Sequence, residues 1–541
     1  MVVAIESDRP KGPRVLITAR EACQQNDQHD FRWSCAILKT SMALLGLDVG
    51  TSGSRALLID ETGSIIASAT EEHEDFASPQ PGWAEQSPDD WWRASQMAVR
   101  AALTNASCSS SDIRGIGLSV QMHGSVLLGA DDTIIRPALI WCDQRTEAEC
   151  QWLTEQVGRE RLVELTSNPA LTGFTLPKLL WIRAHEPKLW NKVQTVLLPK
   201  DYVRFKLTGE RATDMADASG TLLLDVARRQ WSAEMLKATD LDYGMLPSVH
   251  EGPEITGQLT PRVADQIGLT AGTPVVAGGG DQSAGAVGMG IVKPGTVSAT
   301  IGTSGVVFAA TDQPTLDPEG RVHTFCHAVP NRWHTMGVTQ AAGLSLSWFR
   351  SRFGAGEDDG RNPYDRLTDE AATAPTGSDG VLWAPYLMGE RTPYLDSNAR
   401  GALVGLTATH TRAHVVRAIL EGVAFSLQDS FTILEAMKVP VHEIRLGGGG
   451  ARSALWRQIQ ANVYRQQVTT LATEEGAAYG AALLAGVGTG VWASVDEACD
   501  TTVTVATRTD PNDADAALLE RQYARYRTLY PALKTIPGFT K

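Results

Sequence analysis

The tetrapeptide Gly-Thr-Ser-Gly occurs twice in this chain of 541 residues, and each copy interrupts a run of apolar residues. The first copy, Gly50–Gly53, follows Leu44–Val49, and the second, Gly302–Gly305, follows Val297–Ile301. Small residues between two apolar runs favour the tip of a β-hairpin. At such a tip the backbone N–H groups and the short hydroxyl side chains form a concave site for phosphate oxygens. The repeat therefore predicts two related domains that hold a nucleotide between them.

The order of the predicted elements repeats in the two halves of the chain. The first half reads as three short strands, a helix that begins at Pro88, and a closing strand at residues 274–280. The second half opens with a hairpin, a strand and a helix in the same order. Strands that alternate with helices after a duplicated opening predict an α/β protein of two domains with a cleft between them. We place these domains at residues 43–290 and 291–541.

The segment before this regular pattern differs from the rest of the chain. Residues 1–42 contain two early prolines and the polar stretch Glu21–Asp30, with neither helical nor alternating periodicity. We expect an N-terminal extension that is poorly ordered. Met42 would then be a natural start of the folded part.

Composition excludes several classes of function. The formal net charge of −14 argues against a nucleic-acid partner or an acidic membrane surface, because phosphate binding depends on clustered Lys and Arg. An anionic ligand would then be held by local donors and a metal ion. The 7 cysteines are scattered and contain no Cys-x-x-Cys pair, which favours a reducing cytoplasm over a disulfide framework or a zinc site. The stretch 477–492 is short and glycine-rich, so it predicts a buried helix and no membrane span.

Two aspartates follow predicted strands beside glycine-rich turns. Asp48 ends the first strand just before a hairpin tip, where its carboxylate could hold Mg²⁺ against nucleotide phosphates, directly or through water. Asp281 follows the buried strand 274–280 and could accept the hydroxyl proton of an alcohol that attacks a phosphoryl group. Each aspartate could instead start a turn or cap a helix. The second hairpin tip favours the functional interpretation of Asp48. The position of Asp281 at the junction of the two halves, facing the cleft, favours that of Asp281.

Three further motifs bear on nucleotide and metal binding. Gly447–Ala451 follows a predicted strand and opens a helix, a place where bare backbone could contact adenine or ribose. The chain contains no Gly-x-x-x-x-Gly-Lys-Ser/Thr run, which excludes a P-loop, and no Rossmann spacing. His323 and His327 flank Cys326 as metal ligands could, but their segment reads as a strand or loop, which disfavours a metal site.

Several separated motifs resemble those of the FGGY family of carbohydrate kinases. The most specific is the long family signature, Gly401–Leu406 followed after seven residues by His414–Glu421. The segments Asp48–Arg55 and Gly173–Trp181 also match. The resemblance extends from about Leu44 to the C-terminus. It implies two actin-like (ribonuclease H-like) domains and the transfer of a phosphoryl group from ATP, with Mg²⁺, to a sugar hydroxyl.

Within that family the residues are most similar to the xylulokinases, through Gln121–Gly124, Trp141–Asp143, Leu198–Tyr202 and Gly389–Pro393. This similarity implies D-xylulose or a related ketose as the substrate, and it is compatible with a homodimer. The alternatives are a kinase for another pentulose, hexulose or polyol, and a non-catalytic actin-like sugar sensor. The presence of Asp281 argues against the sensor.

The resemblance also implies a role for individual residues. Asp281 would be the catalytic base, and Asp48 would hold the metal ion. The residues expected to contact the sugar are Met122, His123, Asp143 and Gln282. The residues expected to contact the nucleotide are Thr51, Ser52, Arg55, Gly302, Thr303, Gly343, Gly449 and Gly450.

Two of these positions depart from the pattern of many relatives. Those relatives have Asn where Gln282 stands and Lys where Arg55 stands. Gln282 is one methylene longer, which leaves the identity of the sugar open. His123 by itself could equally be a core histidine, and its Met-His-Gly context favours contact with the substrate.

Overall fold

The computed structural model describes residues 42–354, 356, 359–473 and 475–536, together with the strands β1 (Val2–Val3) and β2 (Ile17–Thr18). The chain divides into two compact units, Met1–Thr40 and Ser41–Lys541. Within the first unit, β1 and β2 pair antiparallel. The expectation of a poorly ordered extension concerns residues that lie almost entirely outside the described ones.

The first large sheet of the second unit has seven strands. Six of them lie side by side in one continuous order, and the seventh, β17, pairs only with β7. In spatial order these six are β15 (Ile255–Gln258), β16 (Pro274–Val276), β7 (Ile113–Val120), β3 (Ala43–Val49), β4 (Gly53–Asp60) and β5 (Ile65–Glu72), and β17 is Gly279–Gly280. Strands β3 and β4 pair antiparallel, with Val49 opposite Ser54. The first predicted hairpin is therefore confirmed.

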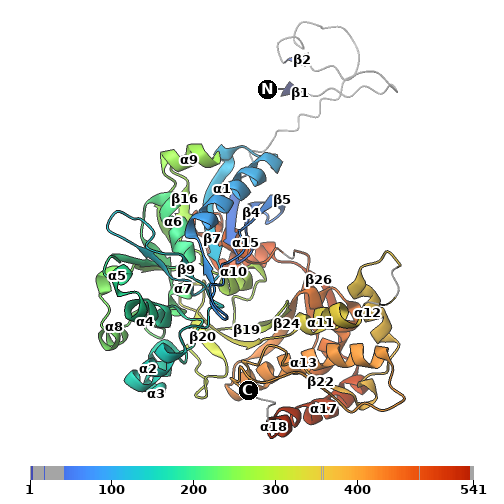
Figure 1. Ribbon diagram of the computed structural model, residues 1–541. Coiled ribbons are helices and arrows are strands. Elements are labelled where there is room, and N and C mark those ends of the chain that lie inside the picture. The colour runs from blue at the N-terminus through green and yellow to red at the C-terminus, as the bar shows by residue number, and fades with distance from the viewer. Residues whose placement is uncertain are drawn as a thin grey trace, which may run out of the picture. The chain divides into compact units, whose positions relative to one another are not determined.

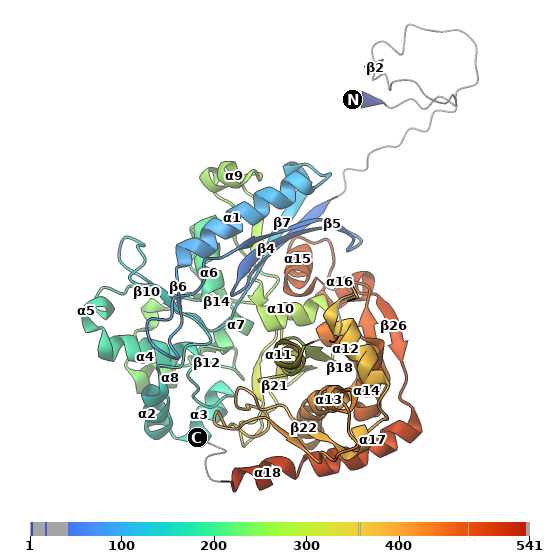
Figure 2. The ribbon, with the colours of Figure 1, turned by 45° about the vertical axis from the view of Figure 1, so that its right-hand side comes forward.

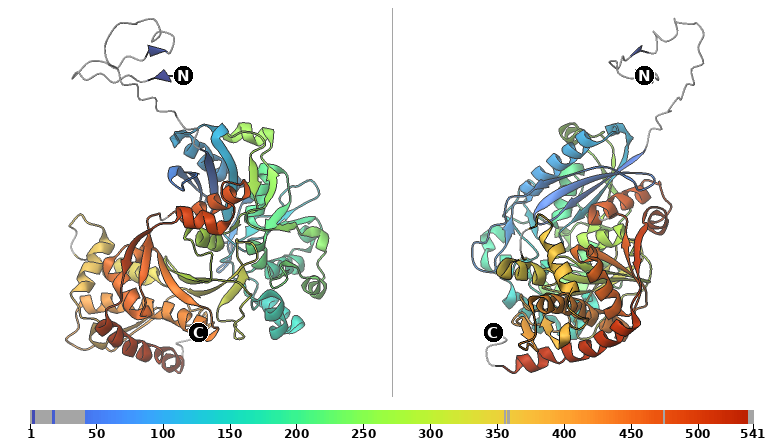
Figure 3. Two further views of the ribbon diagram at one scale, coloured as in Figure 1. Left: turned by 180° about the vertical axis from the view of Figure 1, so that it is seen from behind. Right: turned by 90° about the vertical axis from the view of Figure 1, so that its right-hand side faces the viewer.

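Alternating residues of β3 bury its two faces under different helices. Leu45 and Leu47 belong to a core that lies under helix α1 (Pro88–Asn105), whereas Leu44 belongs to a core formed with helix α15 (Gly476–Gly488). A Cβ added at Gly46 would lie 1.9 Å from the carbonyl oxygen of Ala478. The glycine therefore lets α15 lie directly on the sheet, and the predicted buried helix of small residues is confirmed. Figures 1 and 3 show α15 beside the blue strands.

A helical insert lies between β7 and the later strands of the first sheet. It contains α2 (Glu147–Val157), α3 (Arg159–Thr166), α4 (Thr175–His185), α5 (Pro187–Trp190), α6 (Pro199–Thr208), α7 (Met215–Ser219) and α8 (Ala233–Thr239). Its apolar side chains share one core with Phe308, Phe325 and Met336 of the second half of the chain. This shared core joins the two halves along one side of the cleft.

The second large sheet also has seven strands. Their order is β20 (His323–Cys326), β21 (Trp333–Thr339), β19 (Gly305–Thr311), β18 (Gly295–Ile301), β24 (Val441–Gly448), β25 (Val468–Leu471) and β26 (Val505–Thr509). Strands β18 and β19 pair antiparallel with Ile301 opposite Gly305, which confirms the second predicted hairpin.

Helices from the last part of the chain cover one face of the second sheet (Figure 2). They are α11 (Gly343–Phe353), α12 (Pro363–Ala372), α13 (Arg412–Ala436), α14 (Ala454–Tyr464) and α17 (Asp513–Tyr526). Val297, Ala299 and Ile301 of β18 point into this core. The alternate residues Ser298 and Thr300 face the cleft instead.

Helix α10 (Asp281–Gly288) connects the two halves and begins at Asp281. It packs against α15, which comes from the second half of the sequence but lies on the first sheet. The domain boundary at residues 290 and 291 stays a prediction. Among the helices that the structure describes, none has the length and apolar character needed to cross a membrane.

Candidate active site

Asp48 and Asp281 come together because their strands flank the same neighbour. Asp48 lies opposite Ser119 of β7, and Gly280, immediately before Asp281, lies opposite Val120 of the same strand. The backbone N–H of Gln282 donates a hydrogen bond of 2.7 Å to Asp281 Oδ1. Burial, and second the charge of Asp48, raise the pKa of Asp281 to about 7. The two carboxylates are therefore close enough to interact.

This pair can support both roles expected from the sequence. A carboxylate with a pKa near 7 is suited to exchange a proton with a hydroxyl group at neutral pH. Asp48 Oδ1 is buried and has no hydrogen-bond partner among the described residues, so it is available to a ligand. The described residues form no cluster of three or more metal-binding side chains. Mg²⁺ fits such a site, because it is commonly held by one or two carboxylates and completed by water and phosphate oxygens.

A cavity of about 220 Å³ lies on one side of Asp281. It contains the predicted sugar contacts Met122, His123 and Gln282 together with side chains from both halves of the chain. The other lining residues are Trp141, Leu171, Gly173, Phe174, Ser304, Val306, Met336, Val338 and Arg391. A pocket with an aromatic wall, a few polar groups and one carboxylate suits a small polyhydroxyl ligand.

His123 is held in an unusual backbone conformation, with φ of 69°. Its carbonyl accepts hydrogen bonds from Lys178 Nζ at 2.8 Å and from Thr175 Oγ1 at 3.1 Å. Its Nδ1 donates to the carbonyl of Gly220 at 2.8 Å. Burial lowers the pKa of His123 to about 3, so the ring is neutral and Nε2 carries a free lone pair. A neutral imidazole on the cavity wall can accept a hydrogen bond from a sugar hydroxyl.

Lys178 was not identified as a functional residue from the sequence, although its motif was noted. The side chain is fully buried, and Nζ donates to the carbonyls of His123 and Gly173. Burial lowers the pKa of Lys178 to about 7. Both of its acceptors belong to residues that line the cavity. Lys178 therefore holds the backbone of two residues that line the pocket, His123 and Gly173, in place.

The structure does not bring Asp143 to this cavity. Its side chain is fully buried, Oδ2 accepts a hydrogen bond from the backbone N–H of Ala84 at 2.7 Å, and both carboxylate oxygens pair with Arg145. The carboxylate is occupied by these partners and holds the turn that presents Trp141 to the cavity. Asp143, which the resemblance implied as a sugar contact, does not line this cavity, and a contact with the sugar stays a prediction.

Five of the predicted nucleotide contacts meet in a second cavity of about 310 Å³. These five are Gly302, Thr303, Gly343, Gly449 and Gly450. The backbone N–H of Gly343 donates to the carbonyl of Gly302 at 2.8 Å, and a Cβ at Gly343 would lie 2.4 Å from that oxygen. The hairpin tip and the start of α11 can approach this closely only because residue 343 is glycine. Asn362, Tyr364 and Trp456 also line the cavity and were not predicted.

The other three predicted nucleotide contacts lie at the first hairpin. Thr51 Oγ1 accepts a hydrogen bond from Trp141 Nε1 at 2.9 Å, and Ser52 is exposed at the tip. Arg55 pairs with Glu475, which precedes α15. The charge of Arg55 is therefore engaged within the protein. None of the three lines the cavity formed around Gly302 and Gly343.

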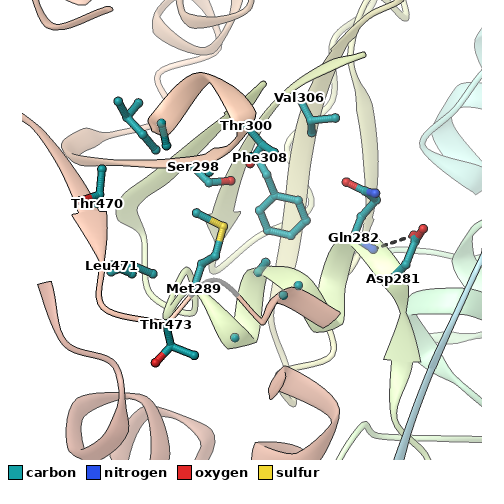
Figure 4. Close-up of a pocket in the computed structure, with 18 residues that line it drawn as sticks. Asp281, Gln282, Met289, Ser298, Thr300, Val306, Phe308, Thr470, Leu471 and Thr473 are labelled. Carbon is teal, nitrogen blue, oxygen red and sulfur yellow. Dashed lines mark hydrogen bonds between the residues drawn. The ribbon is translucent and has the colours of Figure 1, made fainter. Parts of the chain in front are cut away.

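A third cavity, of about 230 Å³, extends from Asp281 along the inner face of the second sheet (Figure 4). Met289 of the chain between the halves, Ser298 and Phe308 line it, and Asp281 and Gln282 lie at one end. Asp281 and Gln282 also line the 220 Å³ cavity. The carboxylate of Asp281 is therefore accessible from the cleft on both sides.

The histidines around Cys326 do not form a metal site in the described part of the chain. His323 Nδ1 pairs with Asn168 Oδ1 at 2.9 Å, and His327 Nε2 donates to the carbonyl of Ile291 at 2.9 Å. Burial lowers the pKa of both rings. The hydrogen bond between His323 and Asn168 therefore links the two halves of the chain.

Two family models match the chain. The one described as the FGGY family of carbohydrate kinases, N-terminal domain, matches residues 43–288, and the one described as the C-terminal domain of that family matches residues 297–489. The chain is 38% identical over 498 residues to the xylulose kinase of Bacillus subtilis (strain 168), which covers 92% of this chain and 97% of that protein. It is 42% identical over 442 residues to the xylulose kinase of Escherichia coli (strain K12). That match covers 82% of this chain and 89% of that protein.

A solved structure is also similar over nearly the whole chain. The crystal structure of xylulose kinase from Rhodospirillum rubrum matches with a TM-score of 0.84 and 30% identity, covering 92% of this chain and 100% of that one. This likeness, with the two sheets described above, confirms the predicted fold class of two actin-like α/β domains.

Proposed function

The chain belongs to the FGGY family of carbohydrate kinases, and on that basis we propose that it phosphorylates D-xylulose with ATP to give D-xylulose 5-phosphate. Two relatives of 38% and 42% identity are both named xylulose kinase, which supports this substrate. The observation that carries the proposal is the position of Asp281, which has a pKa of about 7 and lines the cavity that contains Met122 and His123.

In this reaction Asp281 acts as the general base. As the terminal hydroxyl oxygen of the sugar bonds to the γ-phosphorus of ATP, the bond from that phosphorus to the bridging oxygen breaks and ADP leaves. The hydroxyl proton passes to the carboxylate of Asp281. His123 and Gln282 orient the sugar from the wall of the cavity.

The nucleotide is proposed to lie in the 310 Å³ cavity. The backbone N–H groups around Gly302, Thr303 and Gly450 would face its phosphates, and Trp456 would line the base or ribose end. When bound, Mg²⁺ would supply positive charge that offsets the phosphate oxygens. Asp48 would hold it, because Oδ1 of that residue is buried and has no hydrogen-bond partner among the described residues. Closure of the two halves would exclude water that could otherwise accept the phosphoryl group.

The proposed compartment is the cytoplasm. All five described cysteines are free thiols, which supports a reducing environment. Association into a homodimer stays a prediction.

A substrate panel tests the proposed function. ADP release is measured with D-xylulose, other pentuloses and hexuloses, and polyols, and kcat/KM is compared across the panel. We expect the highest value for D-xylulose. A higher kcat/KM for a different ketose or for a polyol would contradict D-xylulose as the substrate but would leave the assignment as a sugar kinase intact. ATP turnover that does not depend on any sugar would contradict the proposal.

Replacement of His123 by alanine is expected to raise KM for the sugar about tenfold to a hundredfold while KM for ATP changes little. The ring lines the sugar cavity and is absent from the lining of the cavity proposed for the nucleotide. Steady-state kinetics with each substrate varied in turn measures both constants. Equal effects on the two constants, together with a lower Tm, would identify His123 as a core residue.

A further inference from the structure

Arg391 is a cation inside the sugar cavity without an anionic partner. Among the residues that the structure describes, none donates to, accepts from or pairs with its guanidinium group, although Arg391 is only half-exposed and lines the cavity. The charge of its neighbour Glu390 acts on Arg391, but the two side chains form no ion pair among the described residues. The carboxylate of Glu390 instead accepts hydrogen bonds from Thr339 Oγ1 at 2.8 Å and from the backbone N–H of Gln340 at 2.9 Å.

The cavity linings and the strand register separate Arg391 from Asp281. Asp281, Gln282 and Val306 line both the 220 Å³ and the 230 Å³ cavity, whereas Arg391 lines only the first. Val306, which lines the cavity beside Asp281 and Gln282, pairs directly with Val338 of β21. Thr392 then pairs with Val338, with its N–H donating to the Val338 carbonyl at 2.9 Å and its Oγ1 accepting from the Val338 N–H at 3.0 Å. Each lateral step across a sheet is about 4.8 Å, so two steps place the backbone of Thr392, which follows Arg391, about 10 Å from that of Val306.

The N–H donors of the Arg391 guanidinium group have no hydrogen-bond acceptor among the described residues. A guanidinium group has five N–H donors and no acceptor. The nearby rings of His123 and His323 are neutral, because burial lowers the pKa of each. Among the lining residues, Asp281 is the one carboxylate, and it also lines the neighbouring 230 Å³ cavity, which Arg391 does not. An oxygen of a ligand in this cavity can therefore accept hydrogen bonds from Arg391.

The chemistry of a 2-ketopentose fixes which oxygen that is. Its five-membered ring forms by addition of the terminal hydroxyl, O5, to the C2 carbonyl. A sugar whose O5 is free to attack a phosphoryl group is therefore open-chain, and its C2 carbonyl is free. With O5 at Asp281, the carbonyl end of the chain extends toward Arg391.

We propose that Arg391 binds the C2 carbonyl oxygen of the ketose and makes the enzyme selective for ketoses over polyols. This inference rests on the proposed kinase function. A carbonyl oxygen has two in-plane lone pairs and no hydrogen, which suits the planar N–H fork of arginine. Because Arg391 comes from the second half of the chain and Met122 and His123 from the first, the bound ketose also links the two walls of the cleft.

Kinetics of Arg391→Met on a ketose and on its matching polyols test this proposal. With ATP saturating, kcat/KM is measured for D-xylulose, D-arabitol and xylitol. We expect a loss on the order of a hundredfold for D-xylulose and less than about threefold for the polyols, because a charge-assisted hydrogen bond is lost only with the ketose. Arg391→Lys should recover part of the loss. Arg508→Met, on the exposed strand β26, is the matched control and should leave all values unchanged.

Calorimetric binding of ADP provides the second readout and should give the same Kd for Arg391→Met and the unaltered protein. An equal loss for ketose and polyols, or unchanged kinetics with D-xylulose, would overturn the assignment of Arg391. Faster phosphorylation of an aldonate than of any ketose, abolished in Arg391→Met, would also overturn it by showing a carboxylate as the ligand. If the unaltered protein prefers another ketose, the proposed substrate fails, and the Arg391 comparison is decided with that ketose and its polyol.

Discussion

Replacement of Asp281 by asparagine is expected to lower kcat for sugar phosphorylation on the order of a hundredfold or more, because the hydroxyl proton then has no acceptor. The amide has nearly the volume of the carboxylate, and its oxygen can still accept the hydrogen bond from Gln282 N–H. Residue 281 does not line the cavity proposed for the nucleotide. We therefore expect the Kd of ADP, measured by calorimetry, to stay nearly unchanged.

Asp265→Asn on helix α9 (Pro261–Ile267) is the matched control, since its side chain is exposed and lines none of the three cavities described here. It should retain full activity. Near-normal turnover by Asp281→Asn would remove Asp281 from the mechanism. A large loss of ADP binding in that variant would instead indicate that Asp281 supports the structure of the cleft.

Replacement of Asp48 by asparagine is expected to have the second largest effect. Loss of a carboxylate that holds the metal ion should lower kcat on the order of a hundredfold, and higher Mg²⁺ concentrations should recover part of it. Asp48 Oδ1 is the buried oxygen without a hydrogen-bond partner among the described residues. Asp281 remains intact in this variant, so its titration can still be observed.

The pH dependence of Asp48→Asn provides an independent measurement. Burial first, and the charge of Asp48 second, raise the pKa of Asp281 to about 7. A base acts when deprotonated, so kcat/KM of the unaltered protein should fall as the pH drops below about 7. Without the charge of Asp48 the pKa of Asp281 decreases, so this fall should move to lower pH. An acid limb at the same pH in both proteins would show that Asp48 does not act on Asp281.

Local sequence patterns predicted the elements that carry the site. Both hairpin tips were identified from small residues between apolar runs, because that pattern depends on a few consecutive residues. Asp48 and Asp281 could be placed at strand ends, and both strands pair with β7. The clustering of Gly302, Thr303 and Gly343 was likewise expected from motif resemblance, and these residues share a cavity.

Other parts of the site depend on contacts between distant segments. Asp143 belongs to a motif whose Trp141 reaches the cavity, but its own carboxylate is taken by Arg145 and by Ala84, 59 residues earlier in the chain. The spacing of residues within the motif could not show that Arg145 and Ala84 would contact the carboxylate of Asp143. The sequence motifs contain Arg391 and Lys178 but do not reveal what these side chains do. The role of Lys178 follows from the carbonyls that it contacts, and that of Arg391 from the cavity that it lines.

Local sequence patterns thus predicted the two hairpins, the two-domain α/β class and the two aspartates that follow or end strands. The spacing of apolar residues and the positions of glycines are local patterns, and they indicate which face of a helix or strand is buried. Tertiary structure decided what covers that face. Helix α15, late in the chain, lies on the first sheet because Gly46 and Gly117 leave room for its backbone, with Cβ positions only 1.9 Å and 1.8 Å from helix carbonyl oxygens. Only the folded structure shows that these two glycines lie under helix α15.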